Sequence, residues 1–214
     1  MKCVLCERKK AKRFCPAKNL QICALCCGTK RILEIDCPET CGYLSAGRKR
    51  ETEDYQKRLQ KMDFSKQAKC RKALSQYQDV IAHLEYAISR ERLLSRDLKD
   101  KDVARAVDVL LDTYRTEDKG ILYEKTLEDF RIEPLRHELR KIIESRRNPD
   151  KTEGHGVANP QTSRLTLDGA MECLEFIRTL IEIYVEDRSS VSGYIDFLAR
   201  VTPRAEAKSS IILP

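Results

Sequence analysis

The sequence predicts a mainly α-helical fold, in which a small cysteine-rich module at the N-terminus precedes a bundle of five to six helices. Two observations favour helix: the 214 residues include only 8 Gly and 7 Pro, and apolar residues beyond position 47 recur at helical spacing. A third sets the module apart, because eight of the ten cysteines lie between positions 3 and 41. No stretch approaches the roughly 20 consecutive apolar residues of a membrane span, and the polar N-terminus is unlike a signal peptide, so we expect a cytoplasmic protein without membrane contact.

A break in composition near residues 42–47 marks the predicted domain boundary. Residues 1–50 contain 12 Lys and Arg against 4 Asp and Glu, whereas residues 51–214 contain 29 against 30. The excess of basic charge therefore coincides with the cluster of cysteines. We predict a cysteine-rich module over residues 1–46 and a helical domain over residues 47–214.

Most cysteines of the module form close pairs. The pairs are Cys3 with Cys6, Cys23 with Cys26, and Cys37 with Cys41. At this spacing a tight turn aims both thiolates at one ion, and zinc accepts four such ligands in a tetrahedron. In a reducing cytosol this density of cysteines favours metal over disulfides. Eight thiolates suit two closed sites, so we predict two Zn²⁺ ions, with an iron–sulfur cluster or redox disulfides as the alternatives.

Adjacent Cys26 and Cys27 cannot easily point the same way, so we expect them to serve different sites. This predicts an interleaved arrangement of ligands. The first site holds Cys3, Cys6, Cys23 and Cys26, and the second holds Cys15, Cys27, Cys37 and Cys41. A site closed by four thiolates has no open position for substrate or water, so each zinc is predicted to stabilise the fold and not to catalyse.

Two short segments resemble cross-brace zinc fingers of the MYND, HIT and B-box type. They are Arg13-Phe14-Cys15-Pro16, with an aromatic residue before a cysteine, and Ile22-Cys23-Ala24-Leu25-Cys26, which leads into a knuckle. The sequence departs from the families at Lys18, where a ligand is expected, and has no histidine in this region; Cys27 is the candidate replacement. The resemblance implies a cross-brace module that docks partner proteins.

Clustered cations between the first cysteine pair and Cys15 are the candidate contacts to phosphate or to an acidic partner. They are Arg8, Lys9, Lys10, Lys12 and Arg13. Such clusters bind nucleic acid by releasing counterions. The same charges would also offset the anionic thiolate sites, since eight thiolates and two zinc ions add about −4 to the module. Aromatic residues for base stacking are few in the module, because only Phe14 and Tyr43 are present.

Beyond residue 47 the sequence predicts successive helices. The first carries a seam of heptad character over residues 70–88 (Cys70, Leu74, Tyr77, Ile81, Leu84, Ile88), which can pack within the chain or form a homodimer. The next begins at a cap on Asp100 or Asp102, and the third has Pro134 in its first turn. A polar loop over residues 146–165, predicted to be mobile, is followed by a helix capped by Asp168. A last helix, with Ile195 and Leu198 on one face, ends before Pro203.

An active site is not evident in the sequence. Phosphate-binding glycine loops, nucleophile elbows and dinucleotide fingerprints are absent. Arg131 and His137 are similar in spacing to the Arg-x(4–6)-His element of HEPN-type ribonucleases, which implies metal-independent RNA cleavage as an alternative. We predict a non-enzymatic, zinc-binding adaptor or scaffold with a protein partner. The first alternative is a zinc protein that binds nucleic acid through its basic clusters, and the second is the HEPN-like ribonuclease.

Overall fold

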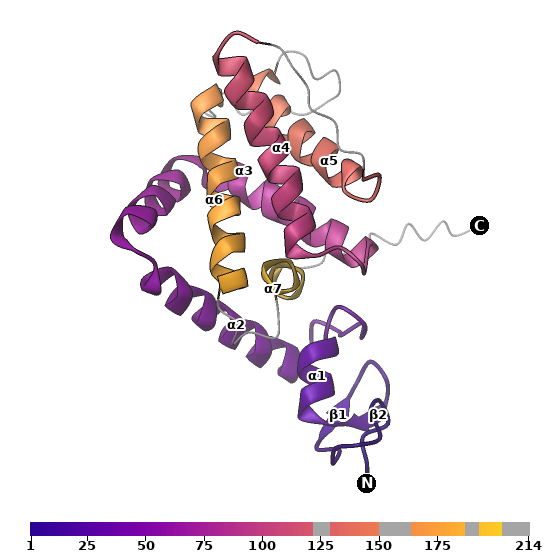
Figure 1. Ribbon diagram of the computed structural model, residues 1–214. Coiled ribbons are helices and arrows are strands. Elements are labelled where there is room, and N and C mark those ends of the chain that lie inside the picture. Colours follow the sequence, from indigo (N-terminus) through magenta and orange to yellow (C-terminus); the bar gives the residue numbers. More distant parts are fainter. Residues whose placement is uncertain (122–128, 150–163, 187–192, 203–214) are drawn as a thin grey trace, which may run out of the picture.

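A computed structural model describes residues 1–121, 129–149, 164–186 and 193–202. Within these residues the protein has seven helices and one two-stranded sheet, so the predicted mainly helical class is confirmed. Figure 1 shows the small module with the N-terminus at one end of the molecule and the helical bundle at the other. None of the described helices is both long enough and apolar enough to cross a membrane.

The N-terminal module contains a hairpin and a short helix. Strands β1 (Arg13–Cys15) and β2 (Leu20–Ile22) pair antiparallel, with Cys15 opposite Leu20, and α1 (Ala24–Lys30) follows directly. Helix α2 (Gly42–Lys61) begins immediately after Cys41 and leads to the bundle. The boundary predicted after residue 46 therefore lies inside a continuous helix, which is a stiffer connection than a loop.

The bundle consists of helices α3 (Phe64–Leu94), α4 (Asp100–Asp118), α5 (Glu133–Arg147), α6 (Leu167–Glu186) and α7 (Tyr194–Val201). Helix α3 packs against α5, α6 and α7, and α4 packs against α5 and α6. Their facing sides form one large apolar core, which includes both Cys70 and Cys173. Burial raises the pKa of the Cys173 thiol to about 12, which keeps it protonated and apolar in the core.

The caps of the helices are only partly as predicted. Pro134 does lie in the first turn of α5. The Asp102 carboxylate accepts from the backbone N–H of Lys99 and so caps α4, but Asp100 instead accepts from the N–H groups of Tyr194 and Ile195 and caps α7. The prediction that Asp168 caps α6 is wrong, because the Thr166 hydroxyl accepts from Gly169 and Asp168 lies inside the first turn.

The seam predicted over residues 70–88 lies on α3 and faces the interior of the same chain. Cys70, Ile81, Leu84 and Ile88 are buried there, and Leu74 and Tyr77 pack against the same core. The helix kinks at Tyr77 (φ −129°, ψ 23°), which splits the long heptad pattern into two segments. A homodimer built on this seam would have to open the core.

The polar loop predicted over residues 146–165 lies largely outside the described residues. Its described ends are held together, because the backbone N–H of Leu165 donates to the carbonyl of Arg146 at 3.0 Å and Arg164 donates to Asn148 at 2.7 Å. Residues 150–163 between them, and Pro203 after α7, fall outside the described ranges.

Candidate metal centre

Four thiols of the N-terminal module converge on one point. The sulfur atoms of Cys3, Cys6, Cys23 and Cys26 all lie within 4.8 Å of one another. Cys3 and Cys6 come from the loop before β1, Cys23 is the N-cap of α1, and Cys26 lies in the first turn of that helix. These are the four residues that the interleaved arrangement assigns to the first site.

The spacing of the thiols fits a single tetrahedral ion. The sulfur atoms of Cys6 and Cys23 are 3.9 Å apart, far beyond the roughly 2 Å of a disulfide bond. A tetrahedron with zinc–sulfur bonds of about 2.3 Å has sulfur–sulfur edges of about 3.8 Å. All ten cysteines are free thiols, so the four side chains are available as ligands.

Backbone N–H groups stabilise negative charge at the first pair of thiols. Burial on its own raises the pKa of Cys3, but N–H groups of Cys23, Leu5 and Cys6 bring it down to about 6. At Cys6 the N–H groups of Lys9 and Arg8 lower the pKa in the same way. Except for that of Cys23, these amides belong to the loop before β1, in which the backbone of Glu7 lies in the left-handed region (φ 53°).

The pKa of Cys26 shifts in the opposite direction. Burial first, and then the neighbouring Cys23, Cys6 and Cys3 sulfurs, raise the pKa of Cys26 to about 12. Four thiolates this close repel one another, so they ionise together only if a cation lies between them. The four sulfur atoms therefore lie close enough together that they could hold one metal ion.

The remaining four cysteines of the module line one small cavity. Cys15, Cys27, Cys37 and Cys41 all line one cavity of about 10 Å³, which is close to the room that a single water molecule needs. Burial, and then the charges of Cys41, Cys15 and Cys27, raise the pKa of the Cys37 thiol. This set does not converge as the first does, because among these four described cysteines no three sulfur atoms lie within 4.8 Å of one another.

The apolar support of the module is small. Its core cluster consists of Cys3, Cys15, Cys23 and Cys26 with the two isoleucines Ile22 and Ile35. A smaller cluster of Ile32, Cys41 and Leu44 lies next to it and contacts Leu93 of α3. Because most buried side chains of the first cluster are thiols, the module depends on what those thiols bind.

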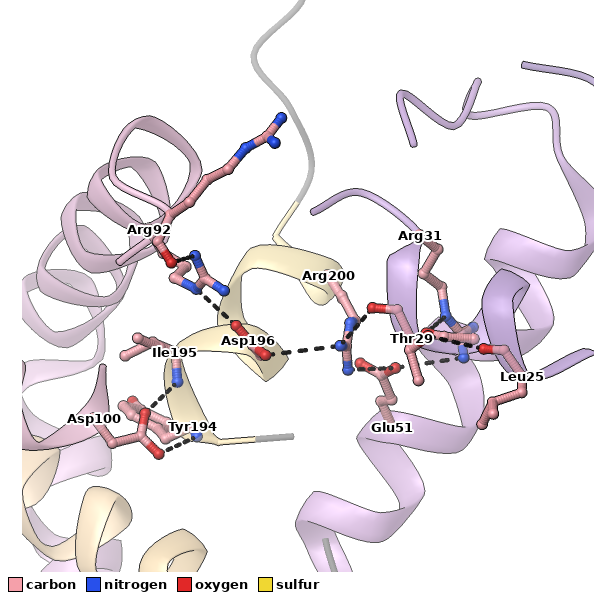
Figure 2. Close-up of polar contacts among 12 residues, drawn as sticks. Leu25, Thr29, Arg31, Glu51, Arg92, Asp100, Tyr194, Ile195, Asp196 and Arg200 are labelled. Carbon is pink, nitrogen blue, oxygen red and sulfur yellow. Dashed lines mark hydrogen bonds and ion pairs between the residues drawn. The ribbon is translucent and has the colours of Figure 1, made fainter. Parts of the chain in front are cut away.

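A network of charged side chains joins the module to the bundle (Figure 2). Arg31, at the end of α1, lies 3.6 Å from Glu51 of α2, which lies 3.6 Å from Arg200 of α7. Asp196 of α7 contacts Arg200 at 3.9 Å and accepts from Arg92 of α3 at 2.7 Å. The Arg200 side chain is only 6% exposed, and its guanidinium also donates to the carbonyl of Thr29 in α1 at 3.4 Å.

The position of Arg31, between the second cysteine cavity and α2, is the residue-level feature that the sequence does not predict. Its side chain is 15% exposed, and it lines the second cysteine cavity as well as reaching Glu51. A methyl group added at Gly47 would lie 1.1 Å from its Nη1 atom, so the glycine leaves the space that Arg31 fills. Gly47 is the available signal, because glycine inside a helix costs about 1 kcal/mol relative to alanine, and a close approach of another group is one reason for it to occur there. Gly28 is not such a signal, since a methyl group there would lie 3.7 Å from Arg31, an ordinary contact.

The basic side chains predicted to contact phosphate or an acidic partner lie mostly at the surface. Arg8, Lys9, Lys10 and Lys12 are exposed, and within the described residues none of these four forms an ion pair. Arg13 is half-buried, with its guanidinium 4.8 Å from the centre of the Tyr43 ring. The module therefore presents exposed positive charge to solvent close to the candidate metal centre.

Arg131 and His137, whose spacing is similar to that in HEPN-type ribonucleases, lie on the bundle, away from the module. Arg131 precedes α5 and His137 lies on it, and both are exposed. The Arg131 guanidinium is occupied by a bidentate contact with Asp129, with the closer distance 2.8 Å. Neither residue contacts the cysteine sites in any described interaction.

Comparisons with models of known protein families, with curated proteins and with solved structures found no match to this chain. The resemblance of residues 13–16 and 22–26 to MYND, HIT and B-box fingers is therefore neither supported nor opposed by them, and it stays a prediction.

Proposed function

We propose that this protein is a non-enzymatic adaptor whose N-terminal module is held in shape by two zinc ions. The observation that carries the proposal is the convergence of Cys3, Cys6, Cys23 and Cys26 at a distance that suits one tetrahedral ion. Zinc fits better than an iron–sulfur cluster, because the inorganic core of a cluster needs its thiolate ligands farther apart.

The second ion belongs to the cavity of Cys15, Cys27, Cys37 and Cys41. Its ligands would come from the hairpin (Cys15), from α1 (Cys27), from the segment between α1 and α2 (Cys37) and from the residue before α2 (Cys41), so an ion there would link four parts of the module. Two closed sites of four thiolates leave no coordination position for a substrate. This chemistry suits a rigid binding module, joined to a bundle by a continuous helix, and so an adaptor.

Native mass spectrometry combined with elemental analysis of the purified full chain tests the metal content. We expect two zinc ions per chain, one ion in a Cys3→Ser variant and one in a Cys37→Ser variant. Cys70→Ala is the matched control, because Cys70 lies in the core of the bundle, and this variant should keep both ions. Iron, or a full zinc complement in both serine variants, would refute the assignment.

Nucleic-acid binding is the second candidate function, and the exposed, unpaired Arg8, Lys9, Lys10 and Lys12 favour it. Affinity for mixed-sequence RNA or DNA would then fall steeply as the salt concentration rises, and neutralising Lys9 and Lys10 would reduce that dependence. Failure of the protein to retain either nucleic acid at low salt would exclude this candidate.

A further inference from the structure

Five exposed residues with apolar side chains gather at the mouth of the second cysteine cavity. They are Phe14, Pro16, Ala17, Pro38 and Tyr43, which all line that cavity, and we call them the hairpin patch. Phe14 and Tyr43 are 49% and 41% exposed. Apolar side chains grouped at a surface, and aromatic ones above all, commonly mark a site of protein interaction.

Each large residue of the hairpin patch is a near neighbour of a ligand in the sequence. Phe14 and Pro16 flank Cys15, Pro38 follows Cys37, and Tyr43 is two residues beyond Cys41. An ion held by these cysteines would therefore fix the backbone on which the patch is built. A patch fixed before its partner arrives loses less conformational entropy on binding.

Positive charge borders the hairpin patch. Arg13 lies over the Tyr43 ring, and exposed Lys18 occupies the same turn as Pro16 and Ala17. Exposed Lys12 directly precedes β1 and is two residues from Phe14 in the sequence. The nearby Glu39 does not offset these charges, because Arg48 already donates to it at 2.9 Å.

We infer that the hairpin patch binds an acidic peptide segment that carries an aromatic or aliphatic anchor. The anchor would lie against Phe14 and its neighbours, and the acidic residues would face Lys12, Arg13 and Lys18. The inference rests on the proposed function, since metal-bound cysteines hold the patch in place.

Single-stranded nucleic acid is the competing ligand for an aromatic and basic surface. Base stacking needs an open ring face. One face of the Tyr43 ring is covered by the Arg13 guanidinium, and the proline and alanine members of the patch have no aromatic face. Phe14 and at most one face of Tyr43 are left for stacking, so the surface fits a peptide anchor better than a run of bases.

Selection from a phage-displayed library of random twelve-residue peptides, on the zinc-loaded full chain, tests the inference. We expect the enriched peptides to be net negative and to share an aromatic or aliphatic residue. Titrated as synthetic peptides, they should bind at least about tenfold more weakly to Phe14→Ser and to Lys18→Glu. Leu25→Ser is the matched control, because Leu25 is 51% exposed in the same module but outside the patch, and it should change the affinity less than about twofold.

The zinc content of every variant is measured in parallel, so that loss of the metal is separated from loss of the contact. Neutral or basic enriched peptides, or equal effects of Phe14→Ser and Leu25→Ser, would overturn the inference while leaving a two-zinc module intact. A chain without zinc would overturn the proposed function itself. A labelled twelve-nucleotide oligouridine is titrated alongside, and its binding without enrichment of acidic peptides would assign the patch to nucleic acid and overturn the inference.

Discussion

At the scale of single residues, Arg31 connects the candidate metal centre to the rest of the molecule. Its guanidinium lines the second cysteine cavity, lies 3.6 Å from Glu51 and donates to the carbonyls of Gly28 at 3.2 Å and Tyr43 at 3.4 Å. A half-buried cation is retained where several acceptors surround it. An ion in the second site would bind its four cysteines as thiolates, so the occupied site would carry a net negative charge next to Arg31. The bound metal and the arginine should therefore stabilise each other.

Replacing Gly47 with alanine tests this role of Arg31. The added methyl group displaces the Arg31 guanidinium, and we expect the lost contacts to cost about 1–2 kcal/mol. Helix propensity returns roughly 1 kcal/mol, so the free energy of unfolding of Gly47→Ala should be equal to that of the wild type or lower. Gly42→Ala, on the same helix with nothing within 4 Å of the added carbon, should not be destabilising. Thermal denaturation followed by circular dichroism compares the two variants.

A double-variant cycle separates displacement of Arg31 from a general intolerance of alanine at position 47. In an Arg31→Ala background there is no guanidinium to displace. Gly47→Ala should then stabilise the protein relative to Arg31→Ala alone, because alanine has the higher helix propensity. An equal loss of stability from Gly47→Ala in both backgrounds would contradict this interpretation.

At the scale of secondary-structure elements, the sequence predicts where helices lie better than how their ends are held. The positions of α4 to α7 follow from helical periodicity and from Pro134, because these signals are local. The cap of α7 comes from Asp100, which is 94 residues away from Tyr194 along the chain. A contact of this kind has no local signal, so the sequence predicts Asp100 only as one of two candidate caps of α4, and it is the other candidate, Asp102, that caps this helix.

The same distinction applies to the candidate site. Spacing alone groups Cys3 with Cys6 and Cys23 with Cys26, and adjacency separates Cys26 from Cys27, because turn and helix geometry are local. The placement of Arg31 between two helices, and the gathering of Phe14, Pro38 and Tyr43 at one cavity, depend on tertiary packing. No pattern in the sequence encodes them directly.

A half-buried carboxyl where α3 packs against α7 gives a pH-dependent prediction. The Tyr194 hydroxyl donates to Glu85 at 2.6 Å, and burial raises the pKa of Glu85. A carboxyl whose pKa is raised by folding contributes stability below its unfolded pKa of about 4.3 and loses it as pH rises through the folded value. Glu85→Gln keeps the acceptor without the charge, so it should raise the melting temperature at pH 7 by about 2–4 °C.

The gain from Glu85→Gln should vanish near pH 4, where the wild-type carboxyl is itself neutral. Melting curves of both proteins over pH 4–8, followed at 222 nm, measure this difference. Glu91→Gln on the same helix is the control for a change of charge alone. A gain that is the same at every pH would show that Glu85 acts through packing and not through its charge.

At the scale of the whole molecule, the two parts of the chain are stabilised by different physical means. The bundle has a continuous apolar core contributed by five helices. The module has two buried isoleucines in its main cluster, and its other buried members there are cysteines. A segment of this size with so little apolar burial folds only with a further constraint, and bound metal supplies one.

Removal of the metal should therefore unfold the module and leave the bundle folded. On chelation at neutral pH we expect amides of the β1–β2 hairpin and α1 to lose protection from hydrogen exchange, while amides of α3 to α6 keep it. Helix α7 should lose protection in part, because Arg200 and Asp196 link it to Arg31 through Glu51. Hydrogen exchange measured by mass spectrometry on the full chain, before and after chelation and after zinc is restored, resolves these regions. Loss of protection in all helices together would show that the two parts fold as one unit, and unchanged protection in the hairpin would show that the thiols hold the module without an ion.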